Sequence, residues 1–210
     1  MPYYAVHYGR ETGIFNTWDE CNTSVNKFSN AIYKKFNSKI DAELFVKYGT
    51  LNQKPIIKTS SYIHVYTDGC CINNGNKNAK AGIGIYFDIN DYRNVSKRII
   101  GSKQTNNIAE LTAIIEVFSI LESEINNKQN IIIHTDSDYS IKCFSTYGKK
   151  CESNNWTNNI PNVELVKTGY YLFENNPNIQ LIHIKAHTNN SDIHSIGNMY
   201  ADKLANESCK

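Results

Sequence analysis

The sequence predicts an α/β domain with a mixed five-stranded sheet and flanking helices, preceded by a small α+β domain. Three observations lead to this interpretation. The first fifty residues hold three short strand-like runs and two amphipathic segments. The stretch "TLNQKPIIKTSS" has a proline, polar residues and no hydrophobic period, which is typical of a linker. Strand-like runs then give way to strand–helix alternation, as in α/β domains. We therefore expect domains at 1–50 and 62–210, joined by a linker at 51–61.

The first domain is expected to be a three-stranded antiparallel sheet with two helices. "YYAVHY" and "GIFNTW" predict strands, with a hairpin turn between Gly9 and Gly13. A short helix is expected over about 22–30, and "AIYKKF" predicts the third strand. A second helix would begin after Ser38 as its N-cap and end at Gly49.

The second domain alternates apolar strands with amphipathic helices. Helix 106–121 has the clearest period, because its apolar residues recur on one face. "NIIIHTD" is a continuous apolar run of the kind buried in a sheet. The other expected elements are strands at 62–67, 81–87, 95–101 and "IQLIHIKAH", with helices from Ser137, near 161–175 and from about Gly197.

Composition points to an intracellular protein, cytoplasmic or nuclear. No apolar stretch approaches the ~20 residues that span a bilayer. The first ten residues show neither a signal peptide nor a transit helix. The six cysteines lack the spacing of a zinc site, and Cys70 and Cys71 are adjacent, so they would point to opposite sides of an extended chain. Free thiols are the expected state.

Two strands of the second domain are expected to end in an aspartate. Asp68 follows "HVYT" and Asp136 follows "IIIHT". Either residue alone would suit turn chemistry, because Asp-Gly and Asp-Ser start turns and cap helices. Two such ends in one domain favour a site, because ligands collect at the carboxyl ends of strands in α/β sheets.

Two helical acids are candidate partners of these aspartates. Glu110 lies within an apolar helix, where an unpaired carboxylate is costly. The alternative is a start like a capping box, with Asn107 as N-cap and Glu110 at the third helical position. Asp202 could equally be a solvated helix acid beside Lys203.

Together the four acids suggest a cage for hard cations. Mg²⁺ is held by a few carboxylates and completes its shell with waters and phosphate oxygens. Two such ions can activate a water and stabilise the leaving oxygen of a phosphodiester. Residues 62–210 carry a net charge of −1, which becomes +3 without these acids and would suit a phosphate ligand.

Five motifs in order resemble those of type 1 ribonucleases H. They are "YTDGCC…NNG", "QTNNIAEL", "HTDSDYS", "KAHT" and "GNMYADKLA", spanning nearly all of residues 62–208. The segments "YYAVHYGRETGIFNTWDEC" and "AIYKKFNSKIDAELFV" resemble the hybrid-binding domain of eukaryotic-type ribonuclease H. This resemblance implies a ribonuclease H-like fold and a monomeric endonuclease that cuts the RNA strand of RNA–DNA hybrids. It also implies two Mg²⁺ ions, for which Mn²⁺ can substitute, and 5′-phosphate and 3′-hydroxyl ends.

The resemblance also implies roles for individual residues. The metal-binding acids would be Asp68, Glu110, Asp136 and Asp202, and His187 would assist proton movement and product release. Asn74, Asn106 and Asn107 match positions that read the minor groove, where the 2′-hydroxyl marks RNA. In the first domain, the DNA-strand aromatics would be Trp18 and Tyr33, and the backbone-binding lysines Lys34 and Lys35.

Three departures from the family pattern bear on function. Ala186 replaces the usual glycine before the histidine, and the long loop "HTNNSDIHSIG" contains His194, a competitor for the mobile proton carrier. The tryptophan-rich basic segment of the family, here called the basic handle, keeps few of its usual residues. Trp156, Lys149 and Lys150 are present, while Cys151 falls where tryptophan is common. Substrate grip would then depend more on residues 1–50, tethered by a linker of roughly 17–20 Å.

Three rival functions remain open at this stage. The chain could coat hybrids without cutting them, although all four acids are present. It could be a related nuclease that acts on DNA duplexes, such as an integrase or resolvase. A thiol or zinc protein is a more distant alternative.

Overall fold

The computed structural model describes most of the chain, in two compact units, Met1–Ser60 and Ser61–Lys210. No helix in the described part is long and apolar enough to cross a membrane. The described residues are 2–37, 39–49, 62–157, 159–186 and 192–210. The expected linker and the expected N-cap Ser38 lie outside them.

The first unit is a three-stranded antiparallel sheet covered on both faces by helices. Its strand order is β2-β1-β3. Ala5 and Val6 alternate across β1, so Ala5 packs with Phe36 and Phe45 on one face and Val6 packs with Cys21 on the other. The elements are β1 Tyr3–Tyr8, β2 Gly13–Phe15, α1 Trp18–Val25, β3 Ile32–Phe36 and α2 Lys39–Tyr48.

Helix α1 begins earlier than the sequence predicted, so the expected helix over 22–30 was wrong. Thr17 and Glu20 form a capping box, in which each side chain binds the other's backbone N–H. Trp18 therefore lies in the first helical turn, and not at the end of a strand. The expected end of α2 is confirmed: Gly49 has φ +77° and its N–H donates to the Phe45 carbonyl at 2.9 Å.

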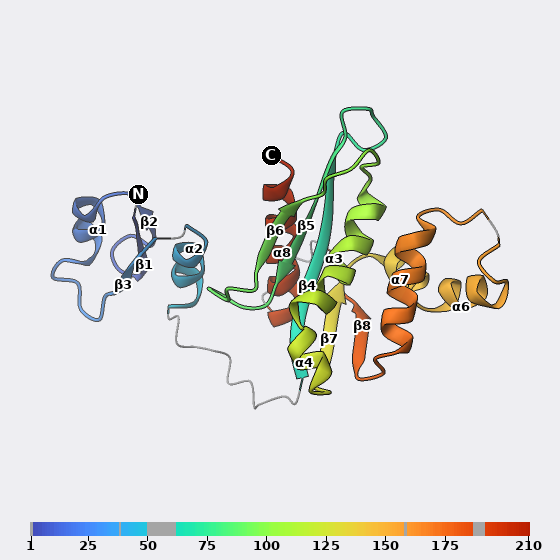
Figure 1. The fold of residues 1–210 in the computed structure, drawn as a ribbon. Coiled ribbons are helices and arrows are strands. Elements are labelled where there is room, and N and C mark those ends of the chain that lie inside the picture. Colours follow the sequence, from blue (N-terminus) through green and yellow to red (C-terminus); the bar gives the residue numbers. More distant parts are fainter. Residues whose placement is uncertain (1, 38, 50–61, 158, 187–191) are drawn as a thin grey trace. The chain divides into compact units, whose positions relative to one another are not determined.

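The second unit is a five-stranded mixed sheet, which confirms the predicted fold class (Figure 1). The order is β6-β5-β4-β7-β8; β4, β7 and β8 run parallel, while β5 and β6 are antiparallel to their neighbours. Its strands are β4 Tyr62–Ile72, β5 Lys80–Tyr86, β6 Val95–Arg98, β7 Asn130–Thr135 and β8 Ile179–His183.

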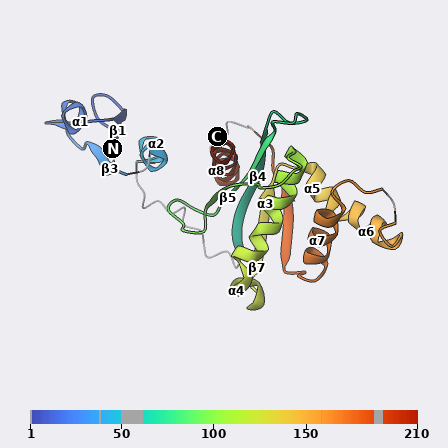
Figure 2. The same ribbon diagram turned by 45° about the horizontal axis from the view of Figure 1, so that its top comes forward.

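Helices cover both faces of this sheet, with α3 and α7 on one face and α8 on the other (Figures 1 and 2). Val65, Ile85 and Ile133 point into the large core under α3, where Leu111 and Ile114 meet them. The helices are α3 Asn106–Ile120, α4 Glu122–Asn126, α5 Asp138–Cys143, α6 Thr146–Ser153, α7 Val163–Glu174 and α8 Ile193–Ser208. The short helices α4 and α6 were not predicted.

Two predicted boundaries near the candidate acids were wrong. Strand β4 does not end at Thr67 but continues to Ile72, because β5 pairs with it from Tyr66 to Ile72. The last helix begins at Ile193, one turn before the expected Gly197. Its N-cap is Asp192, whose Oδ1 accepts from the N–H groups of His194 and Ser195 at 3.0 Å.

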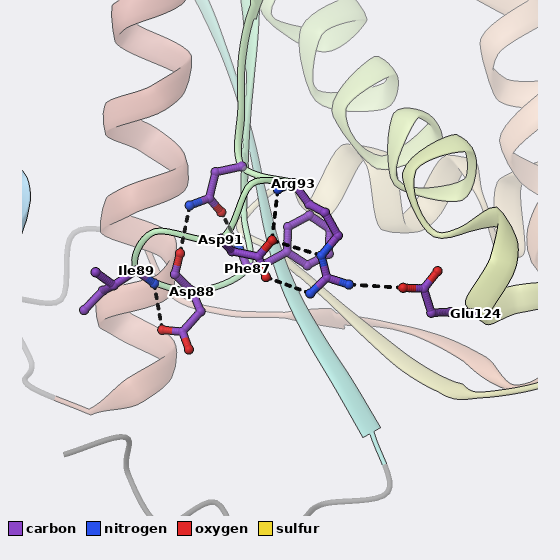
Figure 3. Close-up of polar contacts among 7 residues, drawn as sticks. Phe87, Asp88, Ile89, Asp91, Arg93 and Glu124 are labelled. Carbon is purple, nitrogen blue, oxygen red and sulfur yellow. Dashed lines mark hydrogen bonds and ion pairs between the residues drawn. The ribbon is translucent and has the colours of Figure 1, made fainter. Parts of the chain in front are cut away.

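The connection between β5 and β6 is held by Arg93, as Figure 3 shows. The Arg93 guanidinium donates to Asp91 at 2.7 Å and to Glu124 of α4 at 3.2 Å. Its carbon lies 4.5 Å from the centre of the Phe87 ring. The side chains of this ion-pair network are largely buried, with 15–24% of their surface exposed. Arg93 therefore ties the hairpin connection to α4.

We expect Arg93→Ala to lower the free energy of unfolding of this unit by about 1.5–3 kcal/mol, because two carboxylates lose a charged partner. Urea denaturation monitored by circular dichroism measures this change. Lys97→Ala is the matched control: it removes an ion pair to Glu116 whose lysine is 58% exposed, and should cost less than about 1 kcal/mol. Equal losses in both variants would contradict a special role for Arg93.

Candidate active site

Asp68 and Asp136 are placed side by side by the parallel pairing of β4 with β7. The last paired residues are Thr67 and Thr135, and each aspartate is the residue that follows. Strand β7 ends there, whereas β4 continues along β5, with Asp68 opposite Gly84. Asp68 is 7% exposed. The two carboxylates thus lie at the same end of the paired segments of β4 and β7.

Glu110 reaches the same place from α3. The N-cap of α3 is Thr105, whose hydroxyl accepts from the Ile108 N–H at 3.2 Å. The capping-box alternative with Asn107 as N-cap was therefore wrong, and Glu110 lies two residues further into the helix than that alternative placed it. A side chain at Gly69 would collide with the backbone of Ala109 and Glu110. Glycine at this position lets α3 approach β4 closely.

The three carboxylates form a compact cluster. One oxygen each from Asp68, Glu110 and Asp136 lies within 4.8 Å of the others. Asn106 Nδ2 donates to Glu110 Oε1 at 3.4 Å, and its backbone N–H donates to Asn74 Oδ1 at 3.4 Å. Glu110 Oε2 is buried and finds no hydrogen-bond partner among the described residues. An oxygen in this state is available to a cation.

The clustering shifts the ionisation of these acids. Burial, and then the negative charges of Asp136 and Asp202, raise the pKa of Asp68 to about 8. Burial and the charges of Asp68 and Asp136 also raise the pKa of Glu110 well above its usual value. Like charges held together without water destabilise the ionised state. A divalent cation would offset this cost by neutralising the cluster.

The donor set fits a hard divalent cation. All of the ligand atoms in the cluster are carboxylate oxygens, which Mg²⁺, Mn²⁺ and Ca²⁺ prefer over nitrogen or sulfur. Asp202 of α8 is close enough for its charge to raise the pKa of Asp68, although it is not within the 4.8 Å group. Its Oδ1 accepts from Asn206 Nδ2 at 2.8 Å.

Asn198 of α8 is a site residue that sequence reasoning missed. Its Nδ2 donates to Asp136 Oδ2 at 3.0 Å, and the residue is 4% exposed. Asn198 lies four residues before Asp202, so both occupy one face of α8. The four-residue spacing of Asn and Asp in "GNMYAD" was the only sequence pattern that could have indicated Asn198 as a site residue. The amide is neutral, so it orients the Asp136 carboxylate without neutralising its charge.

The two candidate histidines differ in what the structure says of them. His187 lies outside the described residues. His194 does not join the carboxylates: it lies in the first turn of α8, where its Nδ1 is 3.1 Å from the Tyr66 hydroxyl. The rings of His64 and His134 surround it.

The first unit carries three of its four candidate residues on one exposed aromatic surface. Trp18 and Tyr33 are 43% and 44% exposed, with ring centres 5.9 Å apart. Tyr4 lies 5.8 Å from Trp18, and Lys35 Nζ lies 5.8 Å from the Tyr4 ring. Lys34 is exposed on the same strand but points to the opposite face, where its Nζ lies 5.9 Å from the Phe36 ring. Aromatic rings beside lysines can grip a sugar-phosphate chain.

The basic handle of the second unit is partly buried against the rest of that unit. Trp156 is half-buried, and its Nε1 donates to the Tyr171 hydroxyl at 3.4 Å. Cys151 is 3% exposed, so it belongs to the interior, whereas Lys149 and Lys150 are exposed. All six cysteines are free thiols, as expected. Neither of the two potential metal-ligand clusters in the described residues contains a cysteine.

Comparison with known proteins assigns both units to described families. Residues 60–210 match the family model "RNase H", and residues 2–46 match the "Ribonuclease H1 N-terminal domain". Ribonuclease H1 of Mus musculus is 29% identical over 99% of this chain and 89% of its own length. Ribonuclease H of Schizosaccharomyces pombe is 30% identical over 97% of this chain and 95% of its own.

Solved structures agree with the fold of the second unit. The solution structure of the PFV RNase H domain is similar with a TM-score of 0.53 and 25% identity, over 70% of this chain and 93% of that one. The foamy viral protease–reverse transcriptase in complex with dsDNA is similar with a TM-score of 0.55 and 26% identity, over 70% and 92%.

We expect Asp68→Asn to stabilise the metal-free protein at pH 8. Because the folded-state pKa of Asp68 is raised, the folded protein keeps a proton that the unfolded chain releases between about pH 4 and pH 8. Stability therefore falls as pH rises through that window. Asp68→Asn removes this cost, so its free energy of unfolding should exceed that of the wild type by about 2–4 kcal/mol at pH 8, with little difference at pH 4.

Urea denaturation in a chelating buffer at both pH values provides the measurement. Asp138→Asn is the matched control, because Asp138 is two residues from Asp136 but its side chain is 73% exposed. That variant should leave stability nearly unchanged. A loss of stability in Asp68→Asn at pH 8 would show that hydrogen bonds to Asp68 outweigh the repulsion.

Proposed function

The chain belongs to the ribonuclease H family, and on that premise we propose that it hydrolyses the RNA strand of RNA–DNA hybrids with two Mg²⁺ ions. The products would carry 5′-phosphate and 3′-hydroxyl ends. The observation that carries the proposal is the cluster of Asp68, Glu110 and Asp136, which come from three different elements and converge within 4.8 Å. Burial of Asp68 and Glu110 has no evident structural benefit, because it raises the free energy of the metal-free fold.

The four carboxylates would together hold the metal ions. Asp68 and Asp136, which adjoin the last paired residues of β4 and β7, would be the central ligands of the ions, and Glu110 and Asp202 would be the further ligands. When bound, such ions activate a water and stabilise the leaving oxygen of an in-line displacement. Asn198 would keep Asp136 oriented through its hydrogen bond. His187 would carry the proton, because the competing His194 lies against the rings of His64 and His134 and not beside the acids.

Selection for RNA would come from the amides at the start of α3. Asn106 contacts both Glu110 and Asn74, so this amide group lies directly beside the carboxylates. Asn107 is exposed on the same turn. Amides can donate to and accept from a 2′-hydroxyl, the group that distinguishes RNA from DNA.

The first unit would hold the hybrid while the second cuts it. Trp18 and Tyr33 present exposed rings, with Lys35 on the same face for the phosphates, while Lys34 is exposed on the other face of β3. The enzyme would act as a monomer, because one chain supplies both the acids and the aromatic surface.

Asp136→Asn should reduce cleavage of a labelled hybrid by at least about 1,000-fold, since it removes a charge that two ions share. A Mg²⁺-dependent assay should compare the hybrid with double-stranded RNA, DNA duplex and a single-ribonucleotide substrate. Asp138→Asn should keep nearly full activity. Hybrid binding without cleavage by the wild type would favour a coating protein, and cleavage of plain DNA duplex would favour a nuclease of the integrase type.

The double variant Trp18→Ala/Tyr33→Ala should raise KM for a long hybrid by at least about 10-fold, with kcat within twofold. Each stacked base is worth about 1–3 kcal/mol, and the chemistry takes place in the other unit. Steady-state kinetics at physiological salt measures the split, and Tyr92→Ala serves as control because Tyr92 is 94% exposed in the second unit. Removing residues 1–50 should act in the same direction. An unchanged KM would exclude the aromatic surface from substrate binding.

A further inference from the structure

A second cluster of possible metal ligands lies on the same sheet, away from the carboxylates. His64 comes from β4, His134 from β7 and His194 from the first turn of α8. One ring nitrogen of each lies within 4.8 Å of the other two. His64 Nδ1 is 2.9 Å from His134 Nε2. Three imidazoles from three elements thus converge at one point.

The alternation of β4 explains why these side chains meet. Val65 points into the core under α3, so His64 and Tyr66 point to the opposite face, which α8 covers. On β7 the residue paired with Tyr66 is His134, which shares that face. A side chain at Gly197 would collide with the Tyr66 ring. The first turns of α8, including His194, therefore approach the sheet closely.

Ring stacking alone accounts for only part of this arrangement. His134 stacks on Tyr66 with ring centres 4.8 Å apart and on His64 at 5.2 Å. Such packing would satisfy apolar rings. His134 is 3% exposed, however, and its Nδ1 has no hydrogen-bond partner in the described part of the chain. A buried ring nitrogen without a partner calls for a ligand or a water.

The surroundings of the cluster suit a metal ion. A neutral imidazole nitrogen binds a cation through its lone pair. Asp192, the N-cap of α8, accepts from the His194 N–H, so a carboxylate lies close to the cluster.

We propose that His64, His134 and His194 bind one Zn²⁺-like divalent transition ion, with a water as fourth ligand. Zn²⁺ takes imidazole nitrogen in tetrahedral sites, whereas Mg²⁺ takes oxygen. The two clusters therefore select different ions. His64 and His194 are half-exposed, which gives an ion and its water access.

Such an ion would fix α8 to the two strands that carry the acids. His134 precedes Asp136 by two residues, and His194 precedes Asn198 by one helical turn and Asp202 by about two. Asn198 already contacts Asp136. An ion joining β4, β7 and α8 would hold these donors in register, as a positioning element and not as a catalytic one. The proposal is independent of the proposed function, because binding requires no substrate.

Binding is tested with CoCl₂ and ZnCl₂ on the chelator-treated full-length protein, with millimolar MgCl₂ present to occupy the carboxylates. Co²⁺ should give the intense visible absorption of a four-coordinate nitrogen site, at one ion per chain, and Zn²⁺ should displace it. Saturating Zn²⁺ should raise the Tm of the unit by about 5–10 °C. His64→Asn should lower the affinity by more than about 100-fold, which exceeds the loss expected when only a residue that hydrogen-bonds a metal ligand is changed.

Three further variants make the result decisive. His194→Asn should lose the absorption like His64→Asn, with circular dichroism confirming its fold. His183→Asn changes an exposed histidine of β8 and should bind as the wild type does. Asp68→Asn should also keep the absorption, because the acid cluster is not the Co²⁺ site. Absorption that persists in both His64→Asn and His194→Asn, or that is absent from the wild type, would overturn the proposal.

Discussion

The parallel hydrogen-bonded pairing of β4 with β7 is the constraint on which the second unit depends. Its register sets Thr67 opposite Thr135, and that single fact brings Asp68 next to Asp136. A shift of one residue would send every side chain of a strand to the other face of the sheet. The acids would then enter the apolar core, and the core residues would face α8. Core packing and site geometry are thus specified by the same hydrogen bonds.

Close backbone approach is the second condition for the site, and glycine supplies it on both faces of the sheet. Gly69 admits the backbone of α3 and thereby Glu110, while Gly84 admits α8 near Ala201 and Ala205. The helices come near enough for their polar side chains to reach across the sheet edge. Glu110 arrives from one face and Asn198 from the other. The result is an acidic cluster, with Asp68 and Glu110 buried, whose repulsion the rest of the fold must outweigh.

Hydrophobic periodicity was sufficient to predict the fold class, because buried faces repeat every two residues in strands and every 3.6 in helices. It located β7 and α3 correctly, and hence the neighbourhood of Asp136 and Glu110. It failed where structure depends on partners distant in sequence. Strand β4 is long because β5 pairs with it, and no local pattern around Gly69 indicates this. The histidine cluster was missed for the same reason, since its members are up to 130 residues apart.

The two units show opposite uses of aromatic residues, which bears on how the work is divided. In the first unit, Trp18 and Tyr33 remain more than two-fifths exposed although their strand and helix have apolar cores available. In the second, Trp156 packs against its neighbours and Cys151 is buried, so the segment around them offers little aromatic surface to a substrate. Exposed rings cost hydration free energy unless a ligand covers them. On the proposed function, the first unit therefore carries the grip on the hybrid, and the second retains the buried charges that cutting requires.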